Sequence, residues 1–410
     1  MHRRFKKGVC IVKLIIILVW LIAGVVFLLS TCSQVKPSEK KDIKIGSPFE
    51  SYTEDGLYYI SDSIAHFVEA KTGKDIVLCS KPNCSHKRSP LNYSSICDAY
   101  LGQYPHFLFS DGKAIYFTSA PDTLDAGSVL YDKILYYADM DGKNRKSVTT
   151  LYGLHNINCM DYNNDLIALS YQKMNKIKPG EIVSSKLEKY ITGIIIINLK
   201  TSDYIIVDEF EEYSANIYQI YFYDNKLYYY LFYTTEDLSN INKQEFSDIN
   251  DYYEYISDKF TEKVISYDMD TKEKKLVWEG KNEFVYKQSG GYLLIEKSDK
   301  LLFLKGDLMV GEYNKKKLTD LGSEDMNLYV YNDVLYVFCK NIVRSMDIKT
   351  MDINIVADGK LDGKGIDQII AITGNTLYYE IQHEGNYIKY AIDKDDFFEG
   401  NLQKAKMIKK

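Results

Sequence analysis

The residues best suited to chemistry in this sequence are three cysteines and a histidine that fall within nineteen positions. Cys79, Cys84 and His86 lie close together, and Cys97 follows after ten intervening residues. Zinc prefers four soft or borderline ligands in a tetrahedron, and three thiolates with one imidazole satisfy that preference. The spacing matches neither a common zinc ribbon nor the Cys-x-x-Cys-His of covalent haem attachment. A structural zinc site is therefore one interpretation of the cluster.

A disulfide is the second interpretation of the same residues. In an exported protein disulfides persist, and pairing Cys79 or Cys84 with Cys97 would close a loop that has few apolar residues of its own. One thiol would then be left over, and His86 would have no role. Both interpretations predict that the four side chains meet as one structural site at the edge of the first repeat unit. They differ at His86, which only a metal requires.

No other motif indicates chemistry. The sequence contains no Gly-x-Ser-x-Gly, Walker loop, dinucleotide fingerprint or His-Glu-x-x-His, so we name no catalytic residue. Cys159 and Cys339 stand alone in apolar contexts and are expected to be buried thiols. Past residue 31 the chain has 46 basic and 57 acidic residues, which argues against binding a nucleic-acid backbone.

The first 32 residues have the order of an export signal. Five basic residues and no acid occur in residues 1–31, and residues 14–29 form an unbroken apolar run. Residues 29–32 (Leu-Ser-Thr-Cys) resemble the lipobox of bacterial lipoproteins, which implies lipidation of Cys32, although Thr31 departs from the usual Gly, Ala or Ser. Alternatively the run stays uncleaved and spans the membrane as a helix, or it directs plain secretion.

Lipidation and an uncleaved helix both predict the same location for the rest of the chain. The basic leader stays on the cytoplasmic side, so the body lies outside. We therefore expect a body held at the cell membrane on its extracytoplasmic face, through its N-terminus and a polar linker at residues 33–47.

Two phrases alternate along the body. The first is an Asp, Asn or Gly turn followed by a β-rich run, and its seven copies are anchored by Leu57, Ile115, Leu166, Leu227, Leu293, Leu335 and Leu377. The second is an apolar strand followed by a polar turn, at residues 67–73, 137–143, 197–202, 267–272, 311–316, 346–350 and 391–395. Each pair of phrases predicts four strands, about the size of a propeller blade. The chain is therefore predicted to be all-β, a single β-propeller of seven blades (six to eight) at residues 48–400, preceded by the apolar N-terminal helix and followed by a basic tail at 401–410.

One segment breaks this pattern. Residues 234–263 hold eight acids and three lysines. Five apolar side chains there are spaced three and four apart, which places them on one face of a helix: Phe246, Ile249, Tyr253, Ile256 and Phe260. We expect a helical insertion in the fourth blade, docked on the propeller surface.

The hairpin at residues 137–146, with its Asp-x-Asp-Gly-Lys turn, resembles the repeats of TolB-like and low-density-lipoprotein-receptor-like propellers. With the cysteine cluster, residues 50–400 resemble lipoprotein β-propellers of low-GC Gram-positive bacteria. The resemblance implies a propeller, a lipid anchor and a structural role for the cluster, but no activity.

Two functions are consistent with these features. The first is a membrane-anchored, extracytoplasmic propeller that acts as a binding or scaffold protein for an unknown protein or carbohydrate ligand. The alternative is an extracytoplasmic enzyme that acts on carbohydrate or cell-wall material through the propeller channel. The 37 tyrosines could provide stacking surfaces for sugars, although strands favour tyrosine without any ligand.

Overall fold

A computed structural model describes most of the chain from residue 44 to residue 409. The described residues are 44–45, 49–86, 97–102, 105–120, 132–154, 156–173, 190–238, 241, 246–281, 283–287, 289–297, 300–314, 327–339, 342–358 and 366–409. They all belong to the larger of two compact units, which spans Lys41–Lys410. No helix within them is long and apolar enough to cross a membrane. The leader and its candidate lipidation site, Cys32, lie outside the described residues.

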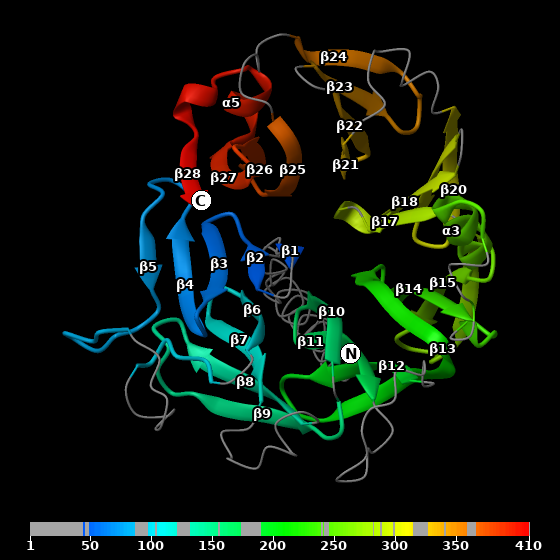
Figure 1. The fold of residues 1–410 in the computed structure, drawn as a ribbon. Coiled ribbons are helices and arrows are strands. Elements are labelled where there is room, and N and C mark those ends of the chain that lie inside the picture. Colours follow the sequence, from blue (N-terminus) through cyan, green and yellow to red (C-terminus); the bar gives the residue numbers. More distant parts are fainter. Residues whose placement is uncertain are drawn as a thin grey trace, which may run out of the picture. The chain divides into compact units, whose positions relative to one another are not determined.

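Antiparallel strands form seven four-stranded blades (Figure 1), in which each strand pairs with the next along the chain. Blade 1 contains β2 (Glu50–Tyr52), β3 (Gly56–Ser61), β4 (Ile64–Glu69) and β5 (Asp75–Val77). Blade 2 contains β6 (His106–Ser110), β7 (Ala114–Ser119), β8 (Lys133–Asp139) and β9 (Lys146–Leu151). Blade 3 contains β10 (Asn156–Asn163), β11 (Leu166–Lys173), β12 (Tyr190–Asn198) and the first part of β13 (Tyr204–Tyr223).

The remaining four blades continue this order. Blade 4 contains the second part of β13, β14 (Lys226–Thr234), β15 (Thr261–Asp268) and β16 (Lys274–Gly280). Blade 5 contains β17 (Phe284–Lys287), β18 (Tyr292–Lys297), β19 (Lys300–Lys305) and β20 (Leu308–Asn314). Blade 6 contains β21 (Asn327–Tyr331), β22 (Val334–Cys339), β23 (Ile342–Asp347) and β24 (Ile353–Asp358). Blade 7 contains β25 (Ile366–Thr373), β26 (Thr376–His383), β27 (Asn386–Asp393) and β28 (Lys406–Lys409).

Short helices connect some of these strands. They are α3 (Ile249–Ser257) between β14 and β15, η3 (Ser289–Gly291) before β18, and α5 (Lys394–Phe398) and η4 (Leu402–Lys404) between β27 and β28. Side-chain caps begin the two α-helices, because Asp248 accepts from Asn250 N and Asp393 accepts from Asp395 N and Asp396 N.

Seven clusters of buried apolar side chains join the blades into a ring. Each cluster draws its residues from two neighbouring blades, and the seventh joins blade 7 to blade 1 through residues such as Tyr378 and Leu57. A single four-stranded sheet would leave both faces exposed, whereas a closed ring covers them. The predicted all-β propeller is confirmed, with seven blades.

The turn–strand phrase marks the second strand of every blade. Its seven anchors lie at the first or second residue of β3, β7, β11, β14, β18, β22 and β26, and all except Leu166 are at most 1% exposed. The preceding turns use backbone angles that Asn and Asp tolerate, as at Asp224 and Asn225, whose φ values are 47° and 57°.

Strand β13 belongs to two blades. Its first part pairs with β12 up to the partners Tyr190 and Glu212, and its second part pairs with β14 from Tyr213 onward. It is therefore the outer strand of blade 3 and the inner strand of blade 4. The strand runs from one blade into the next without a loop, and its backbone departs from the extended conformation at Ser214, where φ is 50°.

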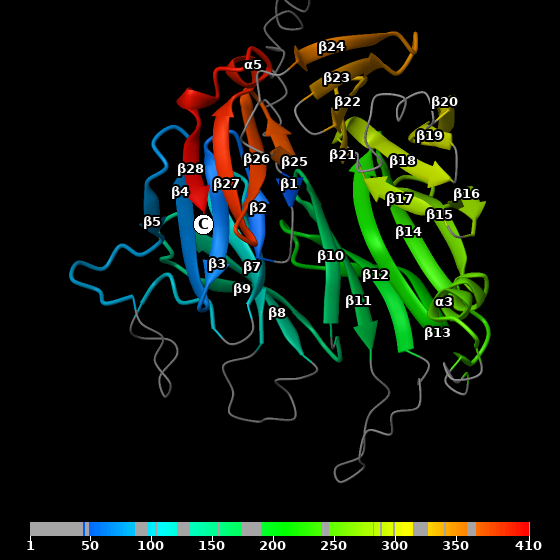
Figure 2. The same cartoon turned by 45° about the horizontal axis from the view of Figure 1, so that its top comes forward.

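Blades 1 and 7 close the ring without exchanging a strand. Every strand of blade 1 comes from the N-terminal end of the propeller and every strand of blade 7 from its C-terminal end, and the two blades lie side by side (Figures 1 and 2). Side chains make the junction: Tyr378 Oη donates to Thr53 O at 2.7 Å, and Thr376 Oγ1 donates to Glu54 O at 2.8 Å.

An ionic cluster strengthens this junction. Glu50 accepts hydrogen bonds from Lys389 Nζ at 2.5 Å, Lys409 Nζ at 2.6 Å and Tyr52 Oη at 2.7 Å. The Glu50 side chain is 10% exposed. Burial alone would raise the pKa of Glu50, but the two ammonium groups and the Tyr52 hydroxyl lower it to about 2.

Three boundaries differ from those expected from the sequence. The basic tail at 401–410 contains β28, the outer strand of blade 7, and β1 (Lys44–Ile45) of the expected linker pairs with β2. The phrase at residues 311–316 does not mark a hairpin, because β20 extends through Asn314 and the preceding turn lies at Gly306, where φ is 58°. Hydrogen bonding between strands decides these boundaries, and the amino-acid composition of the segments does not reveal it.

Candidate functional site

The four residues identified by the sequence lie together in the connection between blades 1 and 2. Cys79, Cys84 and His86 follow β5, and Cys97 precedes β6. Their ligand atoms, three sulfurs and one ring nitrogen, lie within 4.8 Å of one another. Cys97 Sγ is 3.6 Å from His86 Nδ1. Among the described residues, this is the only group of three or more histidine, cysteine or acidic side chains arranged closely enough to hold a metal ion.

The hairpin between β8 and β9 supports this segment. Gly142 in its turn has a φ of 80°, and a Cβ atom there would lie 2.5 Å from Leu78 O and 2.6 Å from Asp98 O. Arg145 of the same hairpin donates to Asp98 O at 3.2 Å, and the Asp98 carboxylate forms an ion pair with Lys81 at 3.1 Å. One hairpin of blade 2 thus contacts the backbone on both sides of the cysteine cluster.

The thiols of the cluster differ in acidity. Burial raises the pKa of Cys97 to about 12, and the neighbouring Cys79 and Cys84 add to the shift. Burial also opposes ionisation of Cys79, but hydrogen bonds from the backbone N–H groups of Lys81 and Asp98 lower the pKa of this thiol overall. The protein therefore favours the thiolate form of Cys79 and the neutral thiol form of Cys97.

One distance within the cluster matches the geometry of a tetrahedral metal site. Zn–S bonds of about 2.3 Å and Zn–N bonds of about 2.0–2.1 Å place neighbouring ligand atoms roughly 3.5–3.8 Å apart, close to the 3.6 Å between Cys97 Sγ and His86 Nδ1. Neither Cys79 nor Cys97 forms a disulfide bond in the structure. Every pairing of the three cysteines would include one of these two.

Other histidine and cysteine side chains lie apart from this cluster. His66 Nδ1 lies 3.1 Å from Asp75 Oδ1, and His383 Nε2 lies 3.8 Å from Glu384 Oε1. Cys159 is half-buried, and its sulfur lies 2.9 Å from Ser170 Oγ. These contacts are local and do not converge on a common point. Cys10, Cys32 and His155 lie outside the described residues, as does the side chain of Cys339.

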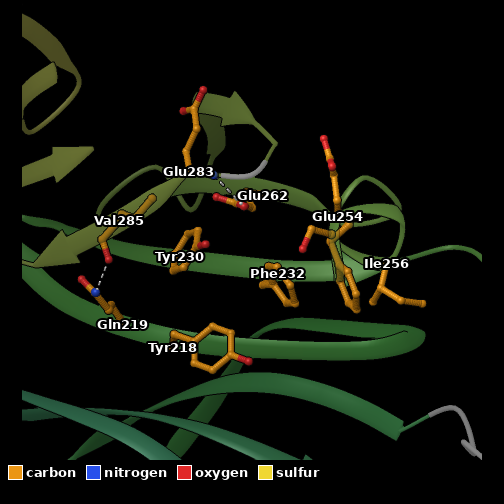
Figure 3. A pocket seen from close by; sticks show the side chains of 11 residues that line it. Tyr218, Gln219, Tyr230, Phe232, Glu254, Ile256, Glu262, Glu283 and Val285 are labelled. Carbon is orange, nitrogen blue, oxygen red and sulfur yellow. Dashed lines mark hydrogen bonds between the residues drawn. The ribbon is translucent and has the colours of Figure 1, made fainter. Parts of the chain in front are cut away.

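A pocket of 780 Å³ lies beside α3, where blade 4 meets blade 5 (Figure 3). In Figure 1, α3 lies next to β15 at the outer rim of the ring. Aromatic side chains from blade 4 and from the segment after α3 line the pocket, together with three glutamates. These residues are Tyr218, Tyr230, Phe232, Phe260, Glu254, Glu262 and Glu283.

The aromatic rings attach the end of the helical insertion to the blade. The rings of Phe232 and Phe260 stack at 4.2 Å with an interplanar angle of 11°, and Tyr218 meets Phe232 edge-on at 5.8 Å. The apolar stripe was expected to dock along its whole length. Ile256 and Phe260 do reach the pocket, whereas Ile249 is 46% exposed and Tyr253 is 53% exposed. The insertion is therefore a helix in blade 4, as expected, that docks through its C-terminal end.

Two of the glutamates are almost fully buried. Glu262 is 3% exposed, and its Oε1 accepts from Glu283 N at 3.2 Å. Burial raises the pKa of Tyr230 well above its ordinary value, and Glu262 adds to the shift, so this hydroxyl stays protonated. The Glu283 side chain is 3% exposed, with its Oε1 2.8 Å from Lys297 Nζ. Its Oε2 has no hydrogen-bond partner in the structure as described.

Sequence reasoning found the helical insertion but not this pocket. Tyr218 and Val285 lie on opposite sides of the insertion in sequence, and Gln219 Nε2 donates to Val285 O at 2.5 Å across the two blades. One feature of the sequence pointed towards the pocket. Phe260 is the last residue of the apolar stripe, and the strand that carries Glu262 follows it directly.

Several solved structures are distantly similar to this chain, with TM-scores below 0.5. Models of known protein families give no match, and no curated protein matches. An acylaminoacyl peptidase structure is 13% identical with a TM-score of 0.47, covering 89% of this chain and 52% of its own. The tricorn protease is 10% identical with a TM-score of 0.48, covering 92% and 36%. The β-propeller domain of the Trilobed protease from Pyrococcus furiosus is 11% identical with a TM-score of 0.42, covering 86% and 93%. The chain thus spans about half the length of the acylaminoacyl peptidase.

Proposed function

We propose that this chain is an extracytoplasmic propeller, held at the cell membrane through its N-terminus, that works by binding a ligand. The pocket beside α3 carries this proposal. It is large enough for a small molecule or a few residues of a peptide. Its described lining combines aromatic rings with buried acceptors and holds no histidine or cysteine that could form a nucleophile–base pair.

Capture of a partner from membranes tests the binding role. Membranes carrying the full-length protein are treated with a short cross-linker, and the products of wild type and Tyr218→Ala are compared. Tyr218 is 53% exposed, so its loss should leave the fold intact. Tyr204→Ala is the matched control, because Tyr204 is 42% exposed on the same strand outside the pocket. We expect a cross-linked species that Tyr218→Ala alone abolishes. Equal products from all three proteins would contradict the proposal.

We further propose that Cys79, Cys84, His86 and Cys97 hold a structural zinc ion. Four ligand atoms within 4.8 Å of one another support this proposal, and backbone N–H groups already bond the Cys79 sulfur. When bound, zinc would neutralise the thiolates and link residues separated by a segment with little apolar content. The ligands themselves would fix the connection between blades 1 and 2.

Metal analysis of protein purified without added zinc, with thiols counted under denaturing conditions, tests this role. We expect about one zinc per chain, and we expect His86→Ala to lower metal content and thermal stability together. A chelator should reproduce that effect on the wild type. The disulfide interpretation makes the opposite prediction, with His86→Ala nearly silent and reductant destabilising. Three free thiols without bound metal would exclude both.

A further inference from the structure

The exposed apolar side chains of this propeller are unevenly distributed. Among the described residues 18 large apolar side chains are exposed, and 11 of them lie within the first three positions of an outer strand. Ten of these 11 are isoleucine, leucine, methionine or valine, whereas six of the other seven are aromatic. Outer strands such as β20 and β24 lie at the circumference of the ring (Figure 1). We call the exposed apolar residues at the start of β13, β16, β20 and β24 the aliphatic rim of blades 3 to 6.

The rim is most apolar in blades 3 and 5. Residues 308–310 (Leu-Met-Val) begin β20 and residues 204–206 (Tyr-Ile-Ile) begin β13, and all six are exposed, Leu308 the most at 68%. The outer strand of blade 2 instead begins with Lys146 and Ser147, so the fold does not require apolar residues at these positions. Contiguous exposed apolar side chains mark a surface that meets an apolar partner.

The backbone of the rim is poorly suited to pairing with another strand. In each of blades 3 to 6, the pairing register between the third and the outer strand shifts beside the rim. Each shift leaves one valine of the outer strand as a bulge: Val207, Val277, Val310 and Val356. A bulge at a sheet edge interrupts the row of backbone groups that an added strand would use. The partner must therefore be recognised by the aliphatic side chains themselves.

The chain enters the propeller at the end of the blades where the rim lies. In an antiparallel blade, the turn between the first two strands and the turn between the last two share one end, and Gly306 N donates to Gly291 O between these turns in blade 5. The rim residues directly follow the second of these turns. At the same end of blade 1, Lys44 pairs with Tyr52, the last residue of β2. The leader and linker therefore join the ring at this end, which we call the turn end.

We infer that the aliphatic rim of blades 3 to 6 lies on the surface of the lipid bilayer, with the turn end of the ring towards the membrane. This inference rests on the membrane attachment proposed above and adds an orientation to it. Isoleucine, leucine and methionine side chains gain free energy when they leave water for the boundary between headgroups and acyl chains.

The orientation also places the pocket beside α3 away from the membrane. Helix α3 connects the second and third strands of blade 4, so it lies at the end of the blade opposite the turn end. Charge contributes little to the lipid contact, because Lys274 and Lys275 beside the rim already pair with Asp208 and Asp307. We therefore expect the same contact with neutral and with anionic lipids.

Tryptophan fluorescence of the full-length protein in liposomes tests this contact. Trp20 and Trp278 are replaced by phenylalanine, and one new tryptophan is introduced as Leu308→Trp in the rim or as Tyr152→Trp. Tyr152 is the matched control, because it is 70% exposed and follows the far end of an outer strand, β9. Phosphatidylcholine with brominated acyl chains quenches tryptophan that reaches the bilayer. We expect Leu308→Trp to be quenched at least about twofold more than Tyr152→Trp, with and without anionic lipid.

Charged variants locate the contact within the rim. Met309→Asp, and separately Ile205→Asp, should reduce the quenching of Leu308→Trp, whereas Ser147→Asp at the start of β9 should not. Weak quenching of both reporters, or stronger quenching of Tyr152→Trp, in protein that sediments with the liposomes would overturn the inference and leave the membrane attachment intact. A cross-linked dimer that Met309→Asp abolishes, without quenching, would also overturn it and assign the rim to a second copy. Protein that does not remain with the liposomes would contradict the attachment itself.

Discussion

At the residue scale, single side chains carry charges that the fold makes stronger than they would be in water. Glu50 is the clearest case, because two lysines and a tyrosine hydroxyl converge on one nearly buried carboxylate. The exposed pair of Lys300 and Glu312 has a similar distance, 2.6 Å, but both side chains are about half exposed. Exposed pairs contribute little to stability, so distance alone does not rank these interactions.

The lowered pKa of Glu50 predicts acid sensitivity of the closed ring. The folded-state pKa is about 2 and the ordinary value is 4.5, so this carboxylate stabilises the fold above pH 4.5. That contribution is lost as the pH falls from 4.5 towards 2, and it amounts to at most about 3 kcal/mol. Lys389→Met should raise the pKa of Glu50 and lower the stability of the protein at pH 7. The variant should therefore lose less stability than the wild type when the pH falls.

Urea unfolding between pH 2 and pH 7 measures this difference. Lys300→Met serves as the control, because it removes an exposed pair and should change stability by less than about 1 kcal/mol at any pH. A Lys389→Met profile parallel to that of the wild type would show that Glu50 does not depend on this lysine.

At the element scale, hairpins and helices position residues that lie on other blades. The β8–β9 hairpin belongs to blade 2, yet its glycine turn and Arg145 contact the backbone around the cysteine cluster that follows blade 1. Helix α3 likewise brings Glu254 and Ile256 to a pocket whose other walls are strands of blades 4 and 5.

Close approach at Gly142 predicts that its substitution disturbs the cysteine cluster. Gly142→Ala would add both strain at a φ of 80° and a clash with two carbonyl oxygens. We expect a loss of about 1–3 kcal/mol in stability and a lower zinc content. Gly153→Ala is matched to it, because Gly153 has a φ of 71° and a Cβ atom there would meet nothing within 4 Å. Gly153→Ala should lower stability by about 1 kcal/mol through backbone strain and should leave the zinc content unchanged. Thermal unfolding and metal analysis of both variants decide whether the contact itself matters.

The blades could be predicted from sequence because their information is local. An Asp, Asn or Gly turn followed by an apolar residue such as Leu227 or Leu377 fixes where a second strand begins, and these residues are buried as that pattern requires. The meeting of Cys97 with Cys79 was also predictable, because rare ligand types lay close in the chain. The pocket was not, because Tyr218 and Glu283 come together only when blades 4 and 5 stack. Strand β13 was equally hidden, since nothing local marks a strand that leaves one sheet and enters the next.

At the scale of the whole molecule, the basic leader and the apolar run that follows it predict on which side of the membrane the body lies. If the leader directs export, protease added to intact cells without their wall should degrade the body. Full protection would contradict the extracytoplasmic location. Cys32→Ser should abolish incorporation of labelled fatty acid if Cys32 is lipidated. With an uncleaved helix, the variant would instead remain in the membrane with its N-terminus intact, and the intact mass of the purified protein distinguishes the two outcomes.

The junction between blades 7 and 1 has a consequence for how the chain could be rearranged. Six junctions are crossed by the polypeptide, whereas side chains alone make the seventh. The start of β2 and the end of β28 lie close together, because Lys409 Nζ is 2.6 Å from Glu50 Oε1. A short linker could join them, and a cut in another connection between blades would then move the open junction elsewhere. The fold should therefore tolerate circular permutation, and the same ring should form whichever blade stands first in the chain.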